Sequence, residues 1–245
     1  MIIATAGWSI PRDCASELPK RGTHLERYAR RLAGAEINTS FYRPHSRETY
    51  ARWADATPES FRFAVKLPQR ITHDDRLRRA RRPLVEFLAQ VAGLGHRLGP
   101  LLVQLPGSAT FERAVVGRFF DLLRSLHDGP VACEPRHASW FSDSAEELLR
   151  RHQIARVAAD PAVVPTAAEP GGAADLAYFR WHGSPRKYWS LYEHAQLAGL
   201  LASVRTLPAG TSVWCVFDNT ASGGALRNAL ELRRLYGRGK RRPSN

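Results

Sequence analysis

The sequence predicts an α/β protein that folds as a single TIM (β/α)8 barrel, with a loop in place of the helix after strand six. Short apolar runs alternate with helical patterns along nearly the whole chain, which is typical of βα units. The length of 245 residues suits one such barrel, which typically has about 250. A doubly wound sheet would carry a glycine-rich fingerprint after its first strand. Here that strand is followed only by the sequence GWSIP from Gly7, so we prefer the barrel.

Eight strands are expected, because eight short runs rich in apolar or β-branched residues are bounded by glycine, proline or polar residues. Each of these runs is followed by a connection that is long enough to cross back over the sheet. We therefore predict parallel strands joined by right-handed crossovers. The predicted strands span residues 1–8, 34–40, 62–68, 101–105, 131–137, 154–160, 176–182 and 211–219.

Helices are expected between most of these strands, from apolar residues at helical spacing and from start and stop signals. Ser46 is a candidate N-cap, Pro83 suits the first helical position, and Gly99-Pro100 ends the helix before it. Residues 161–175 are rich in proline, alanine and glycine, so a loop is predicted there. The predicted helices span residues 24–33, 46–57, 83–98, 111–126, 143–152, 192–207 and 224–236.

One domain is expected over residues 1–237, followed by a basic and mobile tail over residues 238–245. The first eight residues lack the basic region and cleavage site of a signal peptide, so they predict a strand. No apolar run approaches the roughly 18 residues of a membrane helix. Two of the three cysteines, Cys133 and Cys215, fall in predicted strands. These features predict a cytoplasmic protein with no membrane partner.

The formal net charge of +13 suggests nucleic acid as a partner. However, only four of the 36 basic residues are lysines. An arginine- and alanine-rich, lysine-poor chain is what a GC-rich genome gives without selection for DNA binding. Against this background Lys66, near the end of the third strand, stands out.

Polar residues at the predicted strand ends are the main functional signal. A parallel strand covered on both faces should be almost entirely apolar, yet nearly every strand here ends in polar residues. In TIM barrels these ends carry the chemistry. A spacing of two residues places side chains on one face of a strand, here assigned to the barrel interior. Three such pairs are Glu36 with Asn38, Glu134 with Arg136, and Arg180 with His182.

We therefore predict a polar pocket at the C-terminal face of the barrel. We expect an enzyme that acts there on a small anionic, phosphorylated or polyhydroxylated compound by acid–base chemistry, as a hydrolase, lyase or isomerase. Glu134 or Glu36 would be the general acid or base, and the cations would stabilise developing negative charge. The candidate catalytic residues are Glu36, Lys66, Glu134, Arg136, Arg180 and His182.

Further strand-end residues are predicted to hold the ligand. Aromatic rings there would stack on a sugar or base, and amides would orient it. Gly223 and Gly224 precede the last helix, where bare N–H groups favour an anion. The candidate ligand-binding residues are Trp8, Asn38, Tyr42, His73, Gln104, Trp140, Tyr188, Asp218, Asn219, Gly223 and Gly224.

The alternative to a functional site is that these charges pair with one another and only fill the mouth of the barrel, at a cost of several kcal/mol of hydration for each ion.

Other chemistries are weaker alternatives. Glu36 and Glu134 resemble a glycosidase pair, which requires a defined separation. We expect no cofactor, because a divalent metal on Glu36, Glu134, His182 and Asp218 would lack any recognisable ligand spacing. A Schiff base on Lys66 needs a lowered pKa, whereas nearby carboxylates are expected to raise it.

Two non-enzymatic readings also stand. The first is a nucleic-acid-binding protein without catalysis, which would use the very basic segment 70–82 and the tail. Its candidate contacts are Arg78, Arg79, Arg81 and Arg82. The second is a scaffold whose strand ends bind a peptide of a partner protein.

The same motifs resemble the domain-of-unknown-function 72 family, the YecE-like proteins. The resemblance runs from Gly7 to about Leu232 and implies a TIM barrel, but it implies no particular reaction. Three residues depart from the family pattern: Pro135, Gly107 and Asp218. The motifs that carry the resemblance are EINTSFYRPHSRETYARWADATPESFRFAVKLPQRITH, LLVQLP, EPRHASW, FRWHG and FDNTASGGALRNALEL.

Overall fold

The computed structural model describes residues 1–239 and shows an α/β fold with two mainly parallel sheets. The four-stranded sheet has the order β1-β10-β9-β7, and the six-stranded sheet has the order β2-β3-β4-β5-β6-β8. The strands are β1 Ile2–Thr5, β2 Gly34–Ile37, β3 Arg62–Lys66, β4 Leu98–Gln104, β5 Val131–Glu134, β6 Ile154–Arg156, β7 Ala158–Asp160, β8 Gly171–Gly172, β9 Leu176–Trp181 and β10 Ser212–Phe217.

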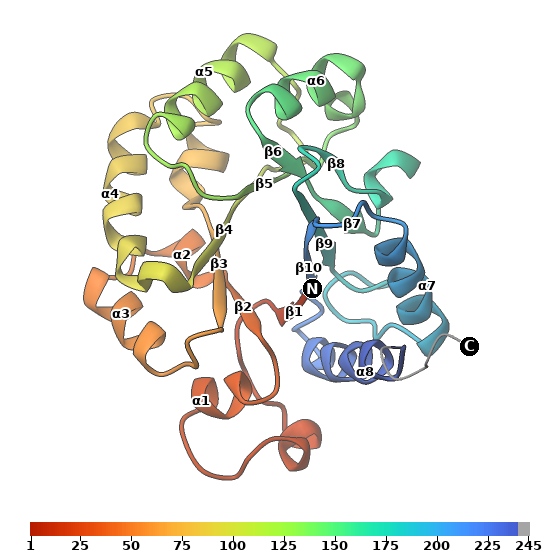
Figure 1. The fold of residues 1–245 in the computed structure, drawn as a ribbon. Helices are drawn as coiled ribbons and strands as arrows, with labels where there is room; N and C mark the ends of the chain where they lie inside the picture. The colour runs from red at the N-terminus through yellow and green to blue at the C-terminus, as the bar shows by residue number, and fades with distance from the viewer. Residues whose placement is uncertain (240–245) are drawn as a thin grey trace.

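The two sheets meet on both sides. On one side the predicted sixth strand is interrupted at Val157, so that β6 pairs with β5 while β7 pairs with β9. On the other side Ala6 forms a parallel bridge with Glu36, and the Gly7 amide donates to the Glu36 carbonyl at 2.8 Å. Figure 1 shows the strands of both sheets around a common centre.

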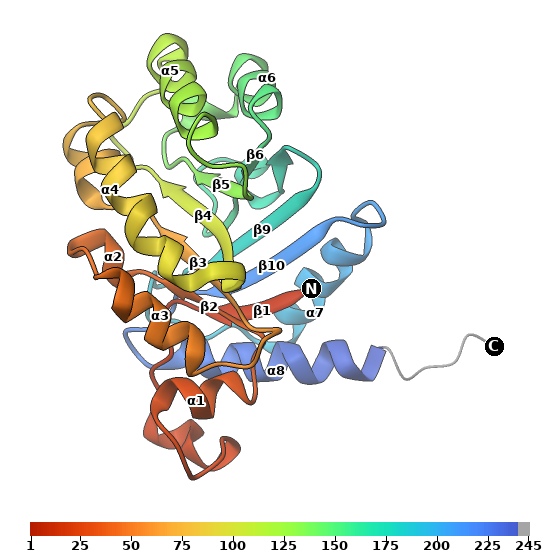
Figure 2. The ribbon, with the colours of Figure 1, turned by 60° about the vertical axis from the view of Figure 1, so that its left-hand side comes forward.

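Helices lie outside the strands (Figure 1), and Figure 2 shows α8 running alongside β1. The helices are α1 His24–Ala29, α2 Thr39–Tyr42, α3 Arg47–Asp55, α4 Arg81–Val91, α5 Arg113–Arg124, α6 Asp143–Arg151, α7 His194–Arg205 and α8 Gly224–Gly239. The predicted alternation of strands and helices is therefore confirmed. Among the described residues no helix is apolar and long enough to cross a membrane.

Local differences from the prediction have identifiable causes. The second strand ends at Ile37, because Asn38 turns into the helical region and α2 follows where a loop is predicted. Residues 161–175 contain no α-helix, as predicted; instead β8 pairs antiparallel with β6. The last helix continues to Gly239, beyond the predicted start of the tail. Residues 240–245 of that tail lie outside the described residues.

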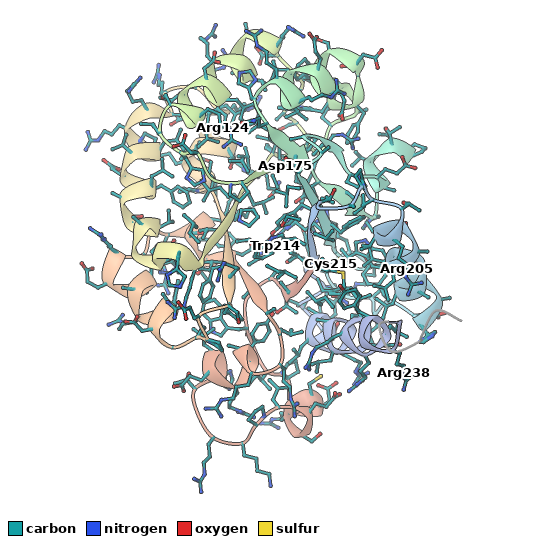
Figure 3. The ribbon with its side chains drawn as sticks, viewed as in Figure 1. Arg124, Asp175, Arg205, Trp214, Cys215 and Arg238 are labelled. Atoms are coloured by element: carbon teal, nitrogen blue, oxygen red, sulfur yellow. The ribbon has the colours of Figure 1, made fainter. Side chains whose placement is uncertain are left out.

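The space enclosed by the strands is filled by a separate apolar cluster. Most of its members are small, which leaves room for the large rings of Tyr178 and Trp214. These rings stack with centroids 6.0 Å apart and an interplanar angle of 8°, and Figure 3 shows Trp214 near the centre. The cluster comprises Ala4, Ala64, Leu102, Ala132, Ala155, Val157, Leu176, Tyr178, Trp214 and Val216.

Trp214 depends on glycines in neighbouring strands. A Cβ atom at Gly99 would lie 2.7 Å from Cζ2 of Trp214, and one at Gly34 would lie 3.3 Å from its Cζ3. The distance at Gly99 is too short for a real contact, so Gly99 makes room for the indole. The Cβ at Gly34 would lie closer still to Ile2 and to the Arg62 carbonyl, at 2.6 and 2.9 Å.

Substituting Gly99→Ala is expected to destabilise the protein by about 1–3 kcal/mol, because the interior is overpacked against Trp214. Phenylalanine lacks the outer ring of the indole, which carries Cζ2. In a Trp214→Phe background the Gly99→Ala substitution should therefore destabilise the protein less. Urea unfolding of the four proteins measures this coupling.

Gly199→Ala in α7 is the matched control, because nothing lies within 4 Å of the added Cβ. It should be neutral or stabilising by up to about 1 kcal/mol. Equal losses for both alanine variants would contradict the packing argument.

Candidate functional site: a buried ionic network at the strand ends

The predicted strand-end residues converge on Arg180 of β9, whose side chain is 1% exposed. Its Nη2 and Nε donate to the carboxylate of Glu36 at 2.7 and 3.0 Å. Its Nη1 donates to Oε2 of Glu134 at 2.7 Å. Its Nη2 also lies 3.1 Å from Oδ2 of Asp218. One guanidinium thus joins acids that follow or belong to three different strands.

These groups lie together because of strand periodicity. Each of five polar residues follows an interior apolar residue by two positions, so its side chain faces the same enclosed space. The pairs are Ala64 and Lys66, Leu102 and Gln104, Ala132 and Glu134, Tyr178 and Arg180, and Val216 and Asp218.

Tyr178 links the apolar cluster to the ionic network. Its hydroxyl donates to Oε2 of Glu36 at 2.7 Å, and the residue is fully buried. Tyr178 is not among the site residues predicted from the sequence. Its position two residues before Arg180, on the same face of the strand, is the signal that identifies it.

His182 lies between two carboxylates. Its Nε2 is 2.9 Å from Oε1 of Glu134, and its Nδ1 is 2.9 Å from Oδ2 of Asp218. An ionised carboxylate only accepts hydrogen bonds, so the ring donates both bonds only as an imidazolium. Although burial raises the pKa of Glu134, the charges of Arg180, His182 and Arg136 hold that pKa well below its ordinary value.

Asp218 has the same balance of effects. Burial raises its pKa, but Arg180 and the hydrogen bond with His182 outweigh burial and lower it. The carboxylates of Glu134 and Asp218 are therefore ionised at neutral pH.

Cationic side chains form the outer edge of the network. Arg136, whose side chain is 20% exposed, donates from Nε to Oε1 of Glu134 at 2.9 Å. Its Nη1 donates to the hydroxyl of Tyr188 at 3.3 Å. Lys187, on the same loop as Tyr188, is half-buried, and burial together with Arg136 lowers its pKa. We call Lys66, Arg136 and Lys187 the cationic rim.

Lys66 differs from the other cations because, within residues 1–239, no carboxylate lies within ion-pair distance of it. Its Nζ lies 3.8 Å from the centroid of the Phe41 ring, and the residue is 9% exposed. Burial and the charge of Arg180 lower the pKa of Lys66 from 10.5 to about 8, although Glu134 and Glu36 act to raise it. The expectation that carboxylates dominate this pKa is therefore wrong.

His73 lies beside the same aromatic ring. Its ring centroid is 4.8 Å from that of Phe41, and its Nδ1 lies 2.9 Å from the Thr72 hydroxyl. Burial and the nearby Lys66 lower the pKa of His73. Phe41 is thus a shared contact of two candidate residues.

Three predicted aromatic ligand contacts lie elsewhere. Trp140 is 1% exposed, because it packs against Phe111 in the apolar core. Its Nε1 donates to the Ala109 carbonyl. Trp8 packs edge-to-face on Trp53 and Phe63. Tyr42 is 79% exposed, because α2 turns its side chain outward.

Two of the predicted amides donate hydrogen bonds to backbone carbonyls. Gln104 donates to the Leu105 carbonyl at 2.6 Å, and Asn219 donates to the Ser190 carbonyl at 3.0 Å. Asn38 and Asn219 each have a buried Oδ1 without a hydrogen-bond partner among the described residues.

The predicted glycines lie at the start of the last helix. Gly223, with a φ of +78°, lines a cavity of about 210 Å³ together with Gly7, Ser9 and Thr220. Gly224 is the first residue of α8 and lies close to Asn219.

No three His, Cys, Asp or Glu side chains among the described residues are arranged to hold a metal ion. Glu36, Glu134 and Asp218 instead accept hydrogen bonds or ion pairs from Arg180 and His182.

Together, the fold and the network define an α/β protein whose parallel strands end in a buried ionic network with a cationic rim. The chain belongs to the family described as "Protein of unknown function DUF72", whose model matches residues 2–245. The curated relative "UPF0759 protein YecE" of Escherichia coli (strain K12) is 36% identical over 128 residues. That match covers 51% of this chain and 46% of the relative, so the chain matches about half the relative's length.

Solved structures of the same family share the fold. A DUF72 family protein from Enterococcus faecalis V583 has a TM-score of 0.80 at 24% identity, covering 96% of this chain and 95% of its own. One from Thermotoga maritima MSB8 has a TM-score of 0.79 at 26% identity, covering 97% and 99%.

Replacing Arg180 by Met should destabilise the protein by about 3–5 kcal/mol at pH 7, because it leaves three buried acids without their shared cation. The difference from the unsubstituted protein should shrink as the pH falls, because loss of Arg180 leaves burial to raise the pKa of Glu134 and Asp218, so these acids take up protons at a higher pH in the variant. Denaturant unfolding at several pH values measures both effects. The exposed Arg151→Met is the control, expected within about 0.5 kcal/mol, and equal effects of the two substitutions would refute the assignment.

Lys66→Met should stabilise the folded protein in a pH-dependent way. The pKa falls from 10.5 to about 8 on folding, which disfavours the folded protein by about 3 kcal/mol wherever the lysine is charged in both states. The gain from the substitution should therefore be full below pH 8 and vanish towards pH 10.5. A gain that is constant over this range in unfolding measurements would contradict the burial of a charged Lys66.

Proposed function

We propose that the strand ends bind a small anion and that Lys66 acts as the acid–base group of an enzyme working on an anionic, phosphorylated or polyhydroxylated compound. The observation that carries this proposal is the burial of Lys66 beside Phe41 without a carboxylate partner among the described residues. A buried cation without a counter-ion is costly, and a bound anion would remove that cost.

We also infer that the two sheets together form a TIM barrel. The shared segment 154–160 and the Ala6–Glu36 bridge connect them on both sides, and helices surround the strands (Figure 1). In such barrels the strand ends are the usual place for substrates, which is where the ionic network lies.

The pairing within the network supports an anionic ligand. The three carboxylates, those of Glu36, Glu134 and Asp218, lie within ion-pair distance of Arg180, Arg136 or His182. Among the described residues Lys66 and Lys187 have no carboxylate at that distance, so their positive charges remain available to an anion. Because the deep groups are 0–8% exposed and bond to one another, the ligand would contact the cationic rim.

Lys66 suits acid–base catalysis better than Glu134 does. A pKa of about 8 leaves roughly a tenth of Lys66 as the free amine at pH 7 and lies near the operating pH, which favours proton transfer. Glu134 is ionised and held by Arg180, Arg136 and His182, so it is a weak base and a poor acid. In this proposal Glu36 and Glu134 position Arg180, while Arg136 and Lys187 hold the anion.

A cytoplasmic location also forms part of the proposal. The three cysteines, Cys14, Cys133 and Cys215, are all unpaired and buried, which fits a reducing compartment.

Sulfate is a suitable first probe, because its charge is constant above pH 3. Isothermal titration at constant ionic strength should show binding that weakens as the pH rises through about 8, because Lys66 loses its proton. Lys66→Met should weaken binding at least tenfold at pH 7 and abolish this pH dependence, whereas the exposed Lys20→Met should change neither. Binding that is unaffected by Lys66→Met would end the proposal of an anion site there.

Catalysis is tested separately with a library of phosphorylated and carboxylated metabolites. Any turnover should disappear in Lys66→Met and should follow a group with a pKa near 8 in the unsubstituted protein. Turnover that survives in Lys66→Met would leave the anion site intact but remove the catalytic role of Lys66.

A further inference from the structure

A second basic site lies on the outer wall, between the start of α4 and the side of α5. A groove of about 480 Å³ is walled by Arg78, Arg79, Arg81 and Arg118. Its apolar floor comes from the segment before α4 and from α5. We call it the arginine groove, and its remaining lining residues are Leu77, Ala80, Val115, Phe119 and Leu122.

The charge of the arginine groove is uncompensated. None of its lining residues is acidic. Arg78 is paired outside the groove with Glu112 at 2.7 Å. By contrast, within the described part of the chain Arg79, Arg81 and Arg118 have no carboxylate at ion-pair distance, and all three are exposed. Three neighbouring free guanidinium groups therefore face solvent around one groove.

The backbone that presents these arginines is unusual. Arg76, Leu77 and Arg79 have φ values of +46°, +67° and +53°, a region that costs non-glycine residues about 1 kcal/mol or more each. The Leu77 amide donates to the Ile71 carbonyl at 2.8 Å, and its side chain is buried, so the surrounding structure holds the segment in place. The backbone on either side of Arg79 is thus anchored by the buried residues Leu77 and Ala80.

We propose that the arginine groove binds the phosphodiester backbone of a nucleic acid. One guanidinium group can donate two hydrogen bonds to two oxygens of the same phosphate. The arginine groove offers three guanidinium groups that have no acidic partner among the described residues. Leu77, Val115 and Phe119 are only 7, 8 and 1% exposed, so a hydrophobic side chain of a partner peptide would bury little new apolar surface there. Recognition is therefore governed by charge, which a regularly charged backbone satisfies.

The free arginines differ from those expected from the sequence. Arg78 and Arg82 have acidic partners, Glu112 and Glu86, whereas Arg118 of α5 joins the site from a distant part of the chain. The groove is separate from the cationic rim, because the two share no lining residue.

Fluorescence anisotropy with a labelled 20-nucleotide single-stranded DNA, at several salt concentrations between 50 and 200 mM, tests the proposal. The unsubstituted protein should bind with an affinity that falls steeply with salt. The triple variant Arg79→Ala, Arg81→Ala and Arg118→Ala should lose at least tenfold in affinity at 50 mM salt. Its slope of log affinity against log salt should be shallower by about 2.

The matched control removes three exposed arginines on other helices, Arg151, Arg205 and Arg233; Figure 3 shows Arg205 on α7, on the other side of the view from α4. Its net charge equals that of the triple variant, but its binding should fall less than threefold. Equal losses in both variants would show a general charge effect and overturn the proposal.

Two further measurements complete the test. A polyglutamate peptide that binds the groove as tightly as the DNA would assign the site to acidic proteins and also overturn the proposal. Lys66→Met should leave DNA binding unchanged, and a loss in that variant would move the DNA to the strand ends. Absence of any DNA binding at 50 mM salt would end the proposal without affecting the sulfate experiment.

Discussion

The interaction on which the structure depends is the enclosure of the Arg180 guanidinium by three acids. A buried arginine loses several kcal/mol of hydration, which only well-placed hydrogen bonds restore. Glu36 and Glu134 accept these hydrogen bonds and Asp218 adds an ion pair, and the three acids lie in or directly after strands that are far apart in sequence. The strands must therefore pair in their observed register for the charges to be satisfied, since a shift of one residue would turn each acid to the opposite face.

The order of strands and helices could be predicted from the sequence because it follows local patterns. Period-two polarity also indicated that Glu36, Glu134, Arg180 and His182 face one space. The sequence could not show that these groups bond to one another, because their pairing depends on how distant strands align. The sequence therefore favoured a polar pocket over a network of charges that pair with each other, whereas the structure has a largely self-satisfied network.

The aromatic residues illustrate the same limit. Trp140 and Tyr42 both follow strand ends, yet one is buried against Phe111 and the other is almost fully exposed. Their directions are set by short helical turns, Ala138–Phe141 and Thr39–Tyr42, which residue order alone did not indicate. The pKa of Lys66 was misjudged for a related reason, since burial depends on Phe41 covering it.

The sixth strand has a consequence for how the molecule unfolds. Residues 154–160 contribute β6 to one sheet and β7 to the other. Unfolding of this segment would therefore remove a neighbouring strand from β5 and from β9 at the same time. Amide protons on β5 and on β9 should then exchange with solvent through the same global opening, and the two halves of the chain should behave as one cooperative unit and not as independently folding pieces.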